Sequence, residues 1–202
     1  MGQENGGKAA GQQSAGALAR ANLGVAIDTG RRFPENVFLG DWEAYWFFDS
    51  DWIFDEEFVE RTKWLLTIEG GECACMADLE APPARDDSQF LIEERITGQD
   101  FQLFLKGAGE GKGWVHSVGR FGCISDVGDW CIYCEKRNEI AVIALRSADG
   151  PRRYETALAG LNALPIEQAL ATRLSYGFSE RALSPDWRDA YIGNYGARSN
   201  SG

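Results

Sequence analysis

The fold is decided by the stretch FGCISDVGDWCIYCEKRNEIAVIALR, which spans residues 121–146. It contains three short apolar-rich runs, at residues 121–124, 130–135 and 139–146, whose β-branched and aromatic residues favour strands. The polar triplet 136–138 predicts a tight turn between the last two runs. Strands joined by short turns pair in antiparallel fashion, so this stretch predicts part of an antiparallel sheet.

Further strands are predicted upstream of this stretch. The run 41–50 is rich in aromatic residues and favours a strand, and a short helix capped by Asp51 or Asp55 is expected to follow it. The other upstream strands are predicted at residues 64–69, 72–79, 89–97, 100–106 and 114–118. The glycine pair at 70–71 predicts a two-residue hairpin turn between the first two of these.

After Pro151 the apolar residues change to helical spacing. Leu158 and Leu161 belong to one apolar stripe. Ser184 and Pro185 predict the N-cap and the first residue of a last helix. Because strands come first and helices last, the sequence predicts an α+β fold, with an antiparallel sheet of short strands and helices from the C-terminal third packed on one face.

The 202 residues are predicted to form one domain between two loose ends. Residues 1–32 hold seven Gly and seven Ala, offer little apolar surface to bury, and are predicted to be a flexible tail. We therefore expect residues 1–30 to be dispensable for folding. The domain is expected over 33–195, with 196–202 as a loose C-terminal end.

Charge excludes one class of partner and points to another. The chain has 20 basic and 31 acidic residues, a net charge of −11, which argues against general nucleic-acid binding. The acid is densest in 33–60, where nine carboxylates meet no Lys or Arg. The longest apolar run, 140–145, has six residues, whereas a membrane span needs roughly 18, so no membrane partner is expected.

The five cysteines indicate a reducing compartment. Their number is odd and no export signal precedes them, so free thiols and a cytoplasmic location are predicted. Cys131 and Cys134 would point to opposite sides of one strand, which argues against a zinc site shared with Cys73 and Cys75. All five thiols are expected to be reduced, metal-free and packed, and no cofactor is expected.

Two catalytic alternatives stay open. His116, the only histidine, could act with a nearby thiol as a nucleophile pair. The carboxylates of Asp49, Asp51 and Asp55 could instead form a catalytic cluster. The glycine-rich loop 106–113 lacks the spacing of a phosphate-binding loop and is predicted to be a hairpin loop.

The segment 33–60 combines its nine carboxylates with ten aromatic residues. Aromatic side chains anchor protein interfaces, and charge steers a partner of opposite sign. The sequence therefore predicts a small acidic protein-binding module for a basic protein, of which an immunity-type inhibitor that neutralises a basic bacterial toxin is one instance. A ligand-binding regulatory module is a further alternative. The residues predicted to bind the partner are Trp46, Asp49, Asp51, Trp52, Asp55, Glu56 and Glu57.

Overall fold

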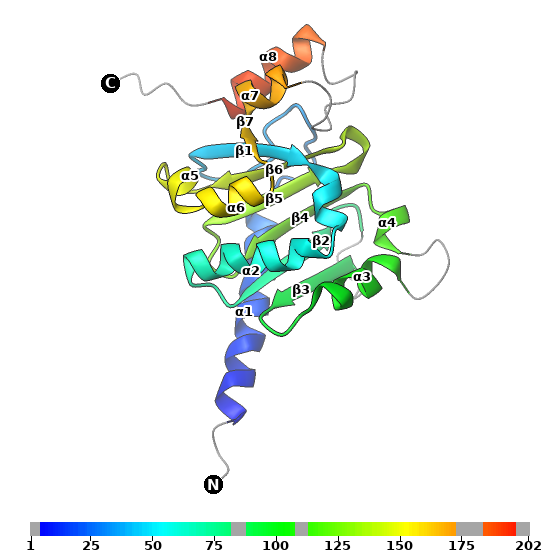
Figure 1. The fold of residues 1–202 in the computed structure, drawn as a ribbon, viewed down its shortest axis with the longest axis vertical. Coiled ribbons are helices and arrows are strands. Elements are labelled where there is room, and N and C mark those ends of the chain that lie inside the picture. The colour runs from blue at the N-terminus through cyan, green and yellow to red at the C-terminus, as the bar shows by residue number, and fades with distance from the viewer. Residues whose placement is uncertain (1–4, 82–87, 108–112, 173–183, 197–202) are drawn as a thin grey trace.

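The computed structural model describes residues 5–81, 88–107, 113–172 and 184–196, with side chains described from Ala15 onward. Seven antiparallel strands form one sheet in the order β3-β2-β4-β5-β6-β1-β7, with helices on both of its faces (Figure 1). The predicted α+β fold class is confirmed. The strands are β1 (Ala44–Asp49), β2 (Cys73–Asp78), β3 (Gln89–Glu93), β4 (Arg120–Ser125), β5 (Trp130–Glu135), β6 (Ile140–Leu145) and β7 (Leu164–Pro165).

The stretch 121–146 forms the middle of the sheet, as β4, β5 and β6. Cys131 on β5 pairs with Ile124 on β4, and Tyr133 pairs with Val142 on β6. All residues of these three strands are buried, because helices cover both faces of the sheet. Long apolar runs are typical of strands that are buried on both sides. The three strands of this stretch could therefore be predicted from the sequence.

The helices divide between the two faces. The longer helices are α1 (Asn5–Ala26), α2 (Glu57–Glu69), α3 (Gly98–Lys106) and α8 (Pro185–Tyr195). The shorter ones are η1 (Ser50–Phe54), α4 (Trp114–Ser117), η3 (Lys136–Asn138), α5 (Gly150–Arg153), α6 (Glu155–Gly160) and α7 (Ile166–Ala171). We call the side covered by α2, α3, α4 and α6 the α2 face, and the side covered by α1, segment 33–42, α7 and α8 the α1 face.

The C-terminal helices do not share one face. Leu158 of α6 packs on the α2 face, whereas Ile166 of α7 and Tyr191 of α8 pack on the α1 face. The short strand β7, which adds to the edge of the sheet beside β1, carries the chain from α6 to α7. The prediction that the C-terminal helices pack together on one face of the sheet is therefore wrong. The start of α8 is as predicted, since the Ser184 side chain accepts a hydrogen bond from the Trp187 N–H.

Residues 64–69, predicted to be a strand, are the second half of α2. Gly70 ends this helix in the left-handed region, with φ of 82°. The Gly70 and Gly71 amides both donate to the Leu66 carbonyl, which satisfies one of the carbonyls left open at a helix end. The glycine pair is therefore a helix C-terminus rather than the predicted hairpin turn.

Residues 100–106 and 114–117 are helical as well, where strands were predicted. Helix α3 begins with a capping box, in which the Thr97 hydroxyl and the Asp100 carboxylate each accept a hydrogen bond from the other residue's N–H. Helix α4 is a single turn that buries Trp114. Of the predicted glycine-rich hairpin loop, residues 108–112 lie outside the described residues.

Helix α1 replaces most of the predicted flexible tail. Ala15, Ala19, Leu23 and Ala26 are buried against the sheet, at helical spacing. The sheet has a glycine under the helix: a Cβ added at Gly122 would lie 2.9 Å from the Cδ1 atom of Leu23 on α1. Because small residues let a helix and a sheet approach closely, the Gly/Ala-rich helix α1 can pack against the sheet. The predicted tail is wrong for residues 15–32, and residues 197–202 of the predicted loose end lie outside the described residues.

Across the described ranges, no helix combines the length and the apolar character needed to cross a membrane.

Candidate partner-binding surface

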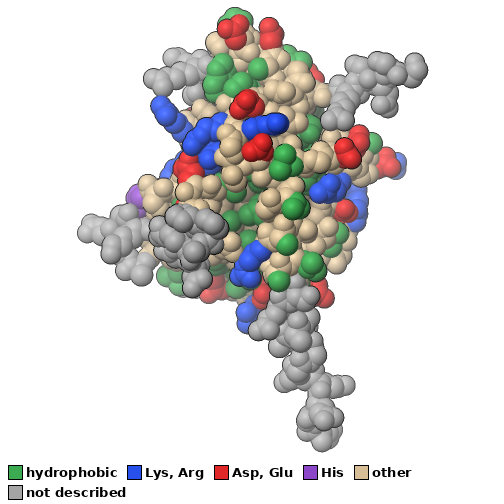
Figure 2. Space-filling view, turned by 180° about the vertical axis from the view of Figure 1, so that it is seen from behind, with side chains coloured by type: hydrophobic (Ala, Val, Ile, Leu, Met, Phe, Trp, Pro, Cys, Tyr) green, Lys and Arg blue, Asp and Glu red, His purple; other side chains and the backbone are tan. Residues whose placement is uncertain are grey.

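The segment 33–60 does not form one surface, because the sheet divides it. Its first aromatics, Phe33, Phe38 and Trp42, pack on the α1 face. Its later ones, from Phe48 to Phe58, pack on the α2 face, and β1 passes between the two groups. The α1 side, seen in Figure 2, carries interspersed acidic and basic side chains. The predicted binding face is therefore confined to the residues around η1 and the start of α2.

Five predicted carboxylates do lie together at the junction of β1, η1 and α2. We call them the acidic surface: Asp49, Asp51, Asp55, Glu56 and Glu57. All are exposed except Asp49, which is half-buried. They follow one another along a short turn of chain, so their charges are concentrated on a small area of the protein.

Backbone hydrogen bonds fix two of these carboxylates. The Asp49 Oδ1 atom accepts from the Asp51 N–H at 2.8 Å and caps η1. The Asp55 Oδ1 atom accepts from the Glu57 N–H at 2.9 Å, where α2 begins. Burial raises the pKa of Asp49, and the Asp51 N–H opposes this shift. The N-cap of α2 is Glu56, which makes no side-chain capping bond, rather than the predicted Asp51 or Asp55. The Asp55 carboxylate is nevertheless held at the start of the helix by its bond to the Glu57 N–H.

The two predicted tryptophan anchors are less accessible than expected. Trp46 is half-buried on β1, in register with Ile143 and Pro165 of the neighbouring strands. Trp52 is half-buried on η1, and the Arg61 guanidinium lies 4.1 Å from its ring centroid. Both rings pack against the core of the α2 face. Their main role in the free protein is to support that core.

An exposed tryptophan lies elsewhere, on α2. Trp64 is 53% exposed. It follows Glu57 by seven residues and Glu60 by four, so all three side chains share one side of the helix. Two helical turns, about 10 Å, separate Trp64 from Glu57 along the axis. Residues 57, 60 and 64 have helical spacing in the sequence, but the prediction of a strand at 64–69 excluded Trp64 from this helix.

The fold brings two distant segments of chain beside the acidic surface. A Cβ added at Gly98 would lie 2.8 Å from the Glu56 carbonyl oxygen, so the start of α3 adjoins Glu56. The Thr97 hydroxyl lowers the pKa of Asp100 by donating to its carboxylate. On the other side, the Ser50 N–H donates to the Glu139 carbonyl at 3.2 Å. Of these two segments, only the start of α3 has a signal in the sequence, the Thr97–Asp100 capping box.

Cations from outside 33–60 partly neutralise this acid. Arg61 pairs with Glu57 at 2.6 Å, and Lys63 pairs with Glu60 at 2.8 Å. Lys136 of η3 lies 5.0 Å from the Phe54 ring centroid. Among the ion pairs between described residues, none involves Asp51, Asp55 or Glu56. These three acids therefore hold most of the charge available to a partner.

The alternative of His116 with a thiol finds no activated nucleophile. His116 is exposed on α4, whereas all five cysteines are buried and free. Burial raises the pKa of Cys73 to about 12 and that of Cys75 to about 11. It also raises the pKa of Cys123, Cys131 and Cys134. Thiols in this state hold almost no reactive thiolate near neutral pH.

Cys131 and Cys134 point to opposite faces of the sheet, as predicted, since Cys131 belongs to the core of the α1 face and Cys134 to that of the α2 face. Within the part of the chain that the structure describes, no three His, Cys, Asp or Glu side chains are grouped to hold a metal ion.

Comparisons with protein families, curated proteins and solved structures found no match. The surface is therefore interpreted from its own chemistry.

Proposed function

We propose that this protein is a protein-binding module that takes a basic partner on the acidic surface, with Trp64 as an anchor. The observation that carries the proposal is the exposed Trp64 on the same side of α2 as Glu57 and Glu60, on the helix that begins at the acidic surface. An inhibitor of the immunity type, which neutralises a basic bacterial toxin, is one instance of such a module. Its five buried free thiols support a cytoplasmic setting.

The two parts of the surface have different roles in this proposal. Unpaired acids attract a basic protein over a distance of about 8–10 Å at physiological salt and accelerate encounter. An exposed tryptophan that becomes buried in the complex slows dissociation, because aromatic anchors carry most of the energy of an interface. Mutations in the acids and in Trp64 should therefore affect different rate constants.

The first test neutralises the acidic surface. The variant carries Asp51→Asn, Asp55→Asn, Glu56→Gln and Glu57→Gln; Asp49 is left intact because it caps η1. The control carries Glu35→Gln, Asp41→Asn, Glu43→Gln and Asp189→Asn, all exposed and outside the surface, so both proteins have the same net charge. A partner captured by cross-linking in the source cell is then mixed with each protein in stopped-flow experiments at several salt concentrations.

We expect association at low salt to slow by about tenfold in the variant, with a flatter dependence on salt, because rim charges act on encounter. The control should keep the wild-type rate within about twofold. Equal slowing in both proteins would mean that net charge alone matters, and the acidic surface would then have no specific role.

The second test removes the anchor. We expect Trp64→Ala to speed dissociation by about tenfold or more, since truncation of a buried interface aromatic commonly costs about 2 kcal/mol or more. Ile192→Ala is the matched control, because Ile192 is also exposed but lies on α8, on the α1 face. Surface plasmon resonance with the captured partner measures both rates. Unchanged dissociation in Trp64→Ala would exclude Trp64 as the anchor.

A further inference from the structure

Strand β3 lies at one edge of the sheet and pairs with β2 alone. The direction of its backbone groups follows from the neighbouring strands. The Asp126 N–H donates to the Cys73 carbonyl at 2.9 Å, so Cys73 and every second residue after it on β2 direct their backbone groups toward β4. The residues between them bond to β3, where their partners are Phe90 and Ile92. The other residues of β3 therefore direct their backbone groups away from the sheet.

These outward groups belong to Gln89, Leu91 and Glu93. The Glu93 carbonyl accepts from the Ile96 N–H at 3.1 Å. Between described residues, the N–H and carbonyl of Gln89 and Leu91 and the N–H of Glu93 make no backbone hydrogen bond beyond β3. The strand has an apolar centre and contains no Lys, Pro or bulge, the features that protect an edge from further pairing. This edge is therefore a template for another strand.

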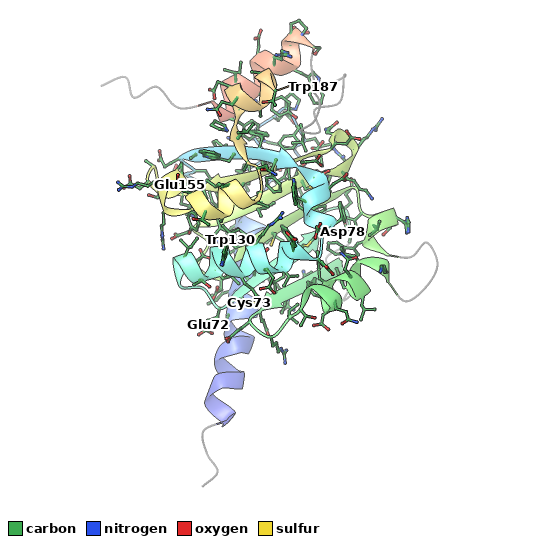
Figure 3. The ribbon with its side chains drawn as sticks, viewed as in Figure 1. Glu72, Cys73, Asp78, Trp130, Glu155 and Trp187 are labelled. Atoms are coloured by element: carbon green, nitrogen blue, oxygen red, sulfur yellow. The ribbon has the colours of Figure 1, made fainter. Side chains whose placement is uncertain are left out.

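Helix α1 crosses the same edge and continues beyond it (Figure 1). Leu23 of α1 lies over β4, whereas a Cβ added at Gly16 would lie 3.0 Å from the Leu91 Cδ1 atom and 3.8 Å from the Cys73 Sγ atom. Figure 3 shows the helix leaving the sheet beside Cys73. Residues 5–14 add about 15 Å of helix beyond this point, and one strand occupies about 4.8 Å. The helix therefore overhangs the position where further strands would lie.

The overhanging part of α1 needs a surface to pack on. Residues 5–14 include three glycines, and each glycine costs about 1 kcal/mol relative to alanine inside a helix. Isolated helices shorter than about 12–15 residues are marginal in water. Its own sheet supports α1 only from Ala15 onward, where residues at helical spacing are buried. A sheet that continued past β3 would supply the missing surface.

We propose that β3 pairs with β3 of a second copy of this chain, antiparallel and about a two-fold axis at Leu91, so that the two sheets become one. A two-fold interface requires a self-complementary surface. In this register Leu91 lies opposite its counterpart, and Gln89 lies opposite Glu93 of the second copy, so the outward backbone groups of both strands meet. Because α1 leaves the sheet at the Glu93 end of β3, the two α1 helices pass on opposite sides of the axis, each over the other copy's sheet.

Charge complementarity favours a second copy as the occupant of this edge. The side chains of Gln89, Leu91 and Glu93 share the α1 face, because alternate residues of a strand do so and Leu91 lies against α1. Arg20 of α1 donates to the Gln89 Oε1 atom at 2.7 Å. Side chains directly opposite each other on paired strands are about 5 Å apart. The pairing therefore places Arg20 of each copy beside Glu93 of the other, a carboxylate that is 7% exposed and pairs with Arg95 in the single chain.

The first measurement is the mass of the full chain in solution, and it does not depend on the proposed binding of a basic partner. In sedimentation equilibrium over about 1–200 µM, we expect a concentration-dependent species of twice the chain mass of 22.3 kDa. A chain that stays monomeric throughout this range overturns the proposal, and the open edge would then be available to an extended segment of another protein.

Leu91→Pro tests the strand pairing. It removes the N–H at the centre of the proposed interface, whereas the β2–β3 bonds do not use this group, and proline is tolerated on edge strands where the N–H faces outward. We expect a monomer whose circular dichroism spectrum remains that of the folded protein. A folded Leu91→Pro protein that still forms the dimer overturns the proposal.

A charge exchange tests the register and decides the question if Leu91→Pro does not fold. Arg20→Glu should raise the Kd of the dimer by about tenfold or more, because it places two carboxylates side by side. Arg152→Glu, an equal change of charge at an exposed position on α5, is the control and should leave Kd within about twofold of wild type. Equal Kd values for these two variants overturn the proposal.

The double variant Arg20→Glu with Glu93→Arg exchanges the two charges and should return the Kd to within about threefold of the wild-type value. A folded double variant with a Kd no lower than that of Arg20→Glu would exclude the proposed register. If the double variant does not fold, the comparison of Arg20→Glu with Arg152→Glu decides.

Discussion

Most buried charges in this protein are tied to the backbone of neighbouring segments. The Arg120 guanidinium donates to the Thr29 and Arg31 carbonyls at 3.1 Å and 3.0 Å. The Glu135 carboxylate accepts from the Tyr133 hydroxyl at 2.6 Å and from the Phe33 N–H at 2.9 Å. These bonds hold the segment after α1 against the ends of β4 and β5, and they satisfy groups that would otherwise be costly to bury. Glu69, at the end of α2, differs from these groups. The Trp130 indole N–H donates to its carboxylate at 2.8 Å. Burial, with a smaller contribution from Asp129, nevertheless raises the pKa of Glu69 from 4.5 to about 7.

This difference predicts how stability depends on pH. A carboxyl whose pKa is higher in the folded than in the unfolded state stabilises the fold fully below its unfolded value, here 4.5, and this contribution is lost as the pH rises through about 7. Glu69→Gln keeps an oxygen for the Trp130 indole and cannot ionise. Relative to Glu69→Gln, the wild-type protein should therefore lose about 1–2 kcal/mol of unfolding free energy between pH 5 and pH 8, discounted for partial exposure. Urea unfolding of both proteins at the two pH values measures this. Parallel stability curves would contradict it.

At the scale of elements, strands with continuous apolar composition were predictable and short amphipathic helices were not. Taken alone, the apolar residues of 100–106 fit both the periodicity of a helix and that of a strand. In the structure Phe101 and Leu105 are buried while Leu103 is 63% exposed, the pattern of a helix. The deciding information lies just before this segment, where Thr97 and Asp100 form a capping box. The secondary-structure propensities of residues 100–106 could not decide between a helix and a strand.

The candidate surface was predictable only where it is local in sequence. The acids from Asp49 to Glu57 adjoin one another along the chain, so composition alone located them. Trp64 could be placed only with the knowledge that α2 continues to Glu69. The backbone at Gly98 and at Glu139 is brought close to the surface by the packing of α3 and by a bond to Ser50. The division of 33–60 between two faces follows from β1 lying inside the sheet, between β6 and β7. A linear charge count cannot represent that arrangement.

At the scale of the whole molecule, the sheet is covered on both sides by segments far apart in sequence. Helices α2, α3, α4 and α6 close one face, and the chain before β1 joins the C-terminal helices on the other (Figure 1). Ile124, Cys131 and Tyr133 belong to the core of the α1 face. Without α1 and the segment that follows it, part of this apolar face would be open to water. The N-terminal region is therefore an integral part of the fold.

This architecture predicts that residues 1–30 are required for stability. Deleting them should lower the melting temperature by more than about 10 °C or abolish folding, since it uncovers the apolar α1 face. Point variants refine the test. Leu23→Ala truncates a side chain that is 6% exposed and should cost about 2–4 kcal/mol, whereas Leu18→Ala, 52% exposed on the same helix, should change stability by less than about 0.5 kcal/mol. Thermal unfolding followed by circular dichroism measures all three. A melting temperature that stays within a few degrees after the deletion, together with equal effects of the two leucine variants, would mean that α1 does not pack on the sheet in solution.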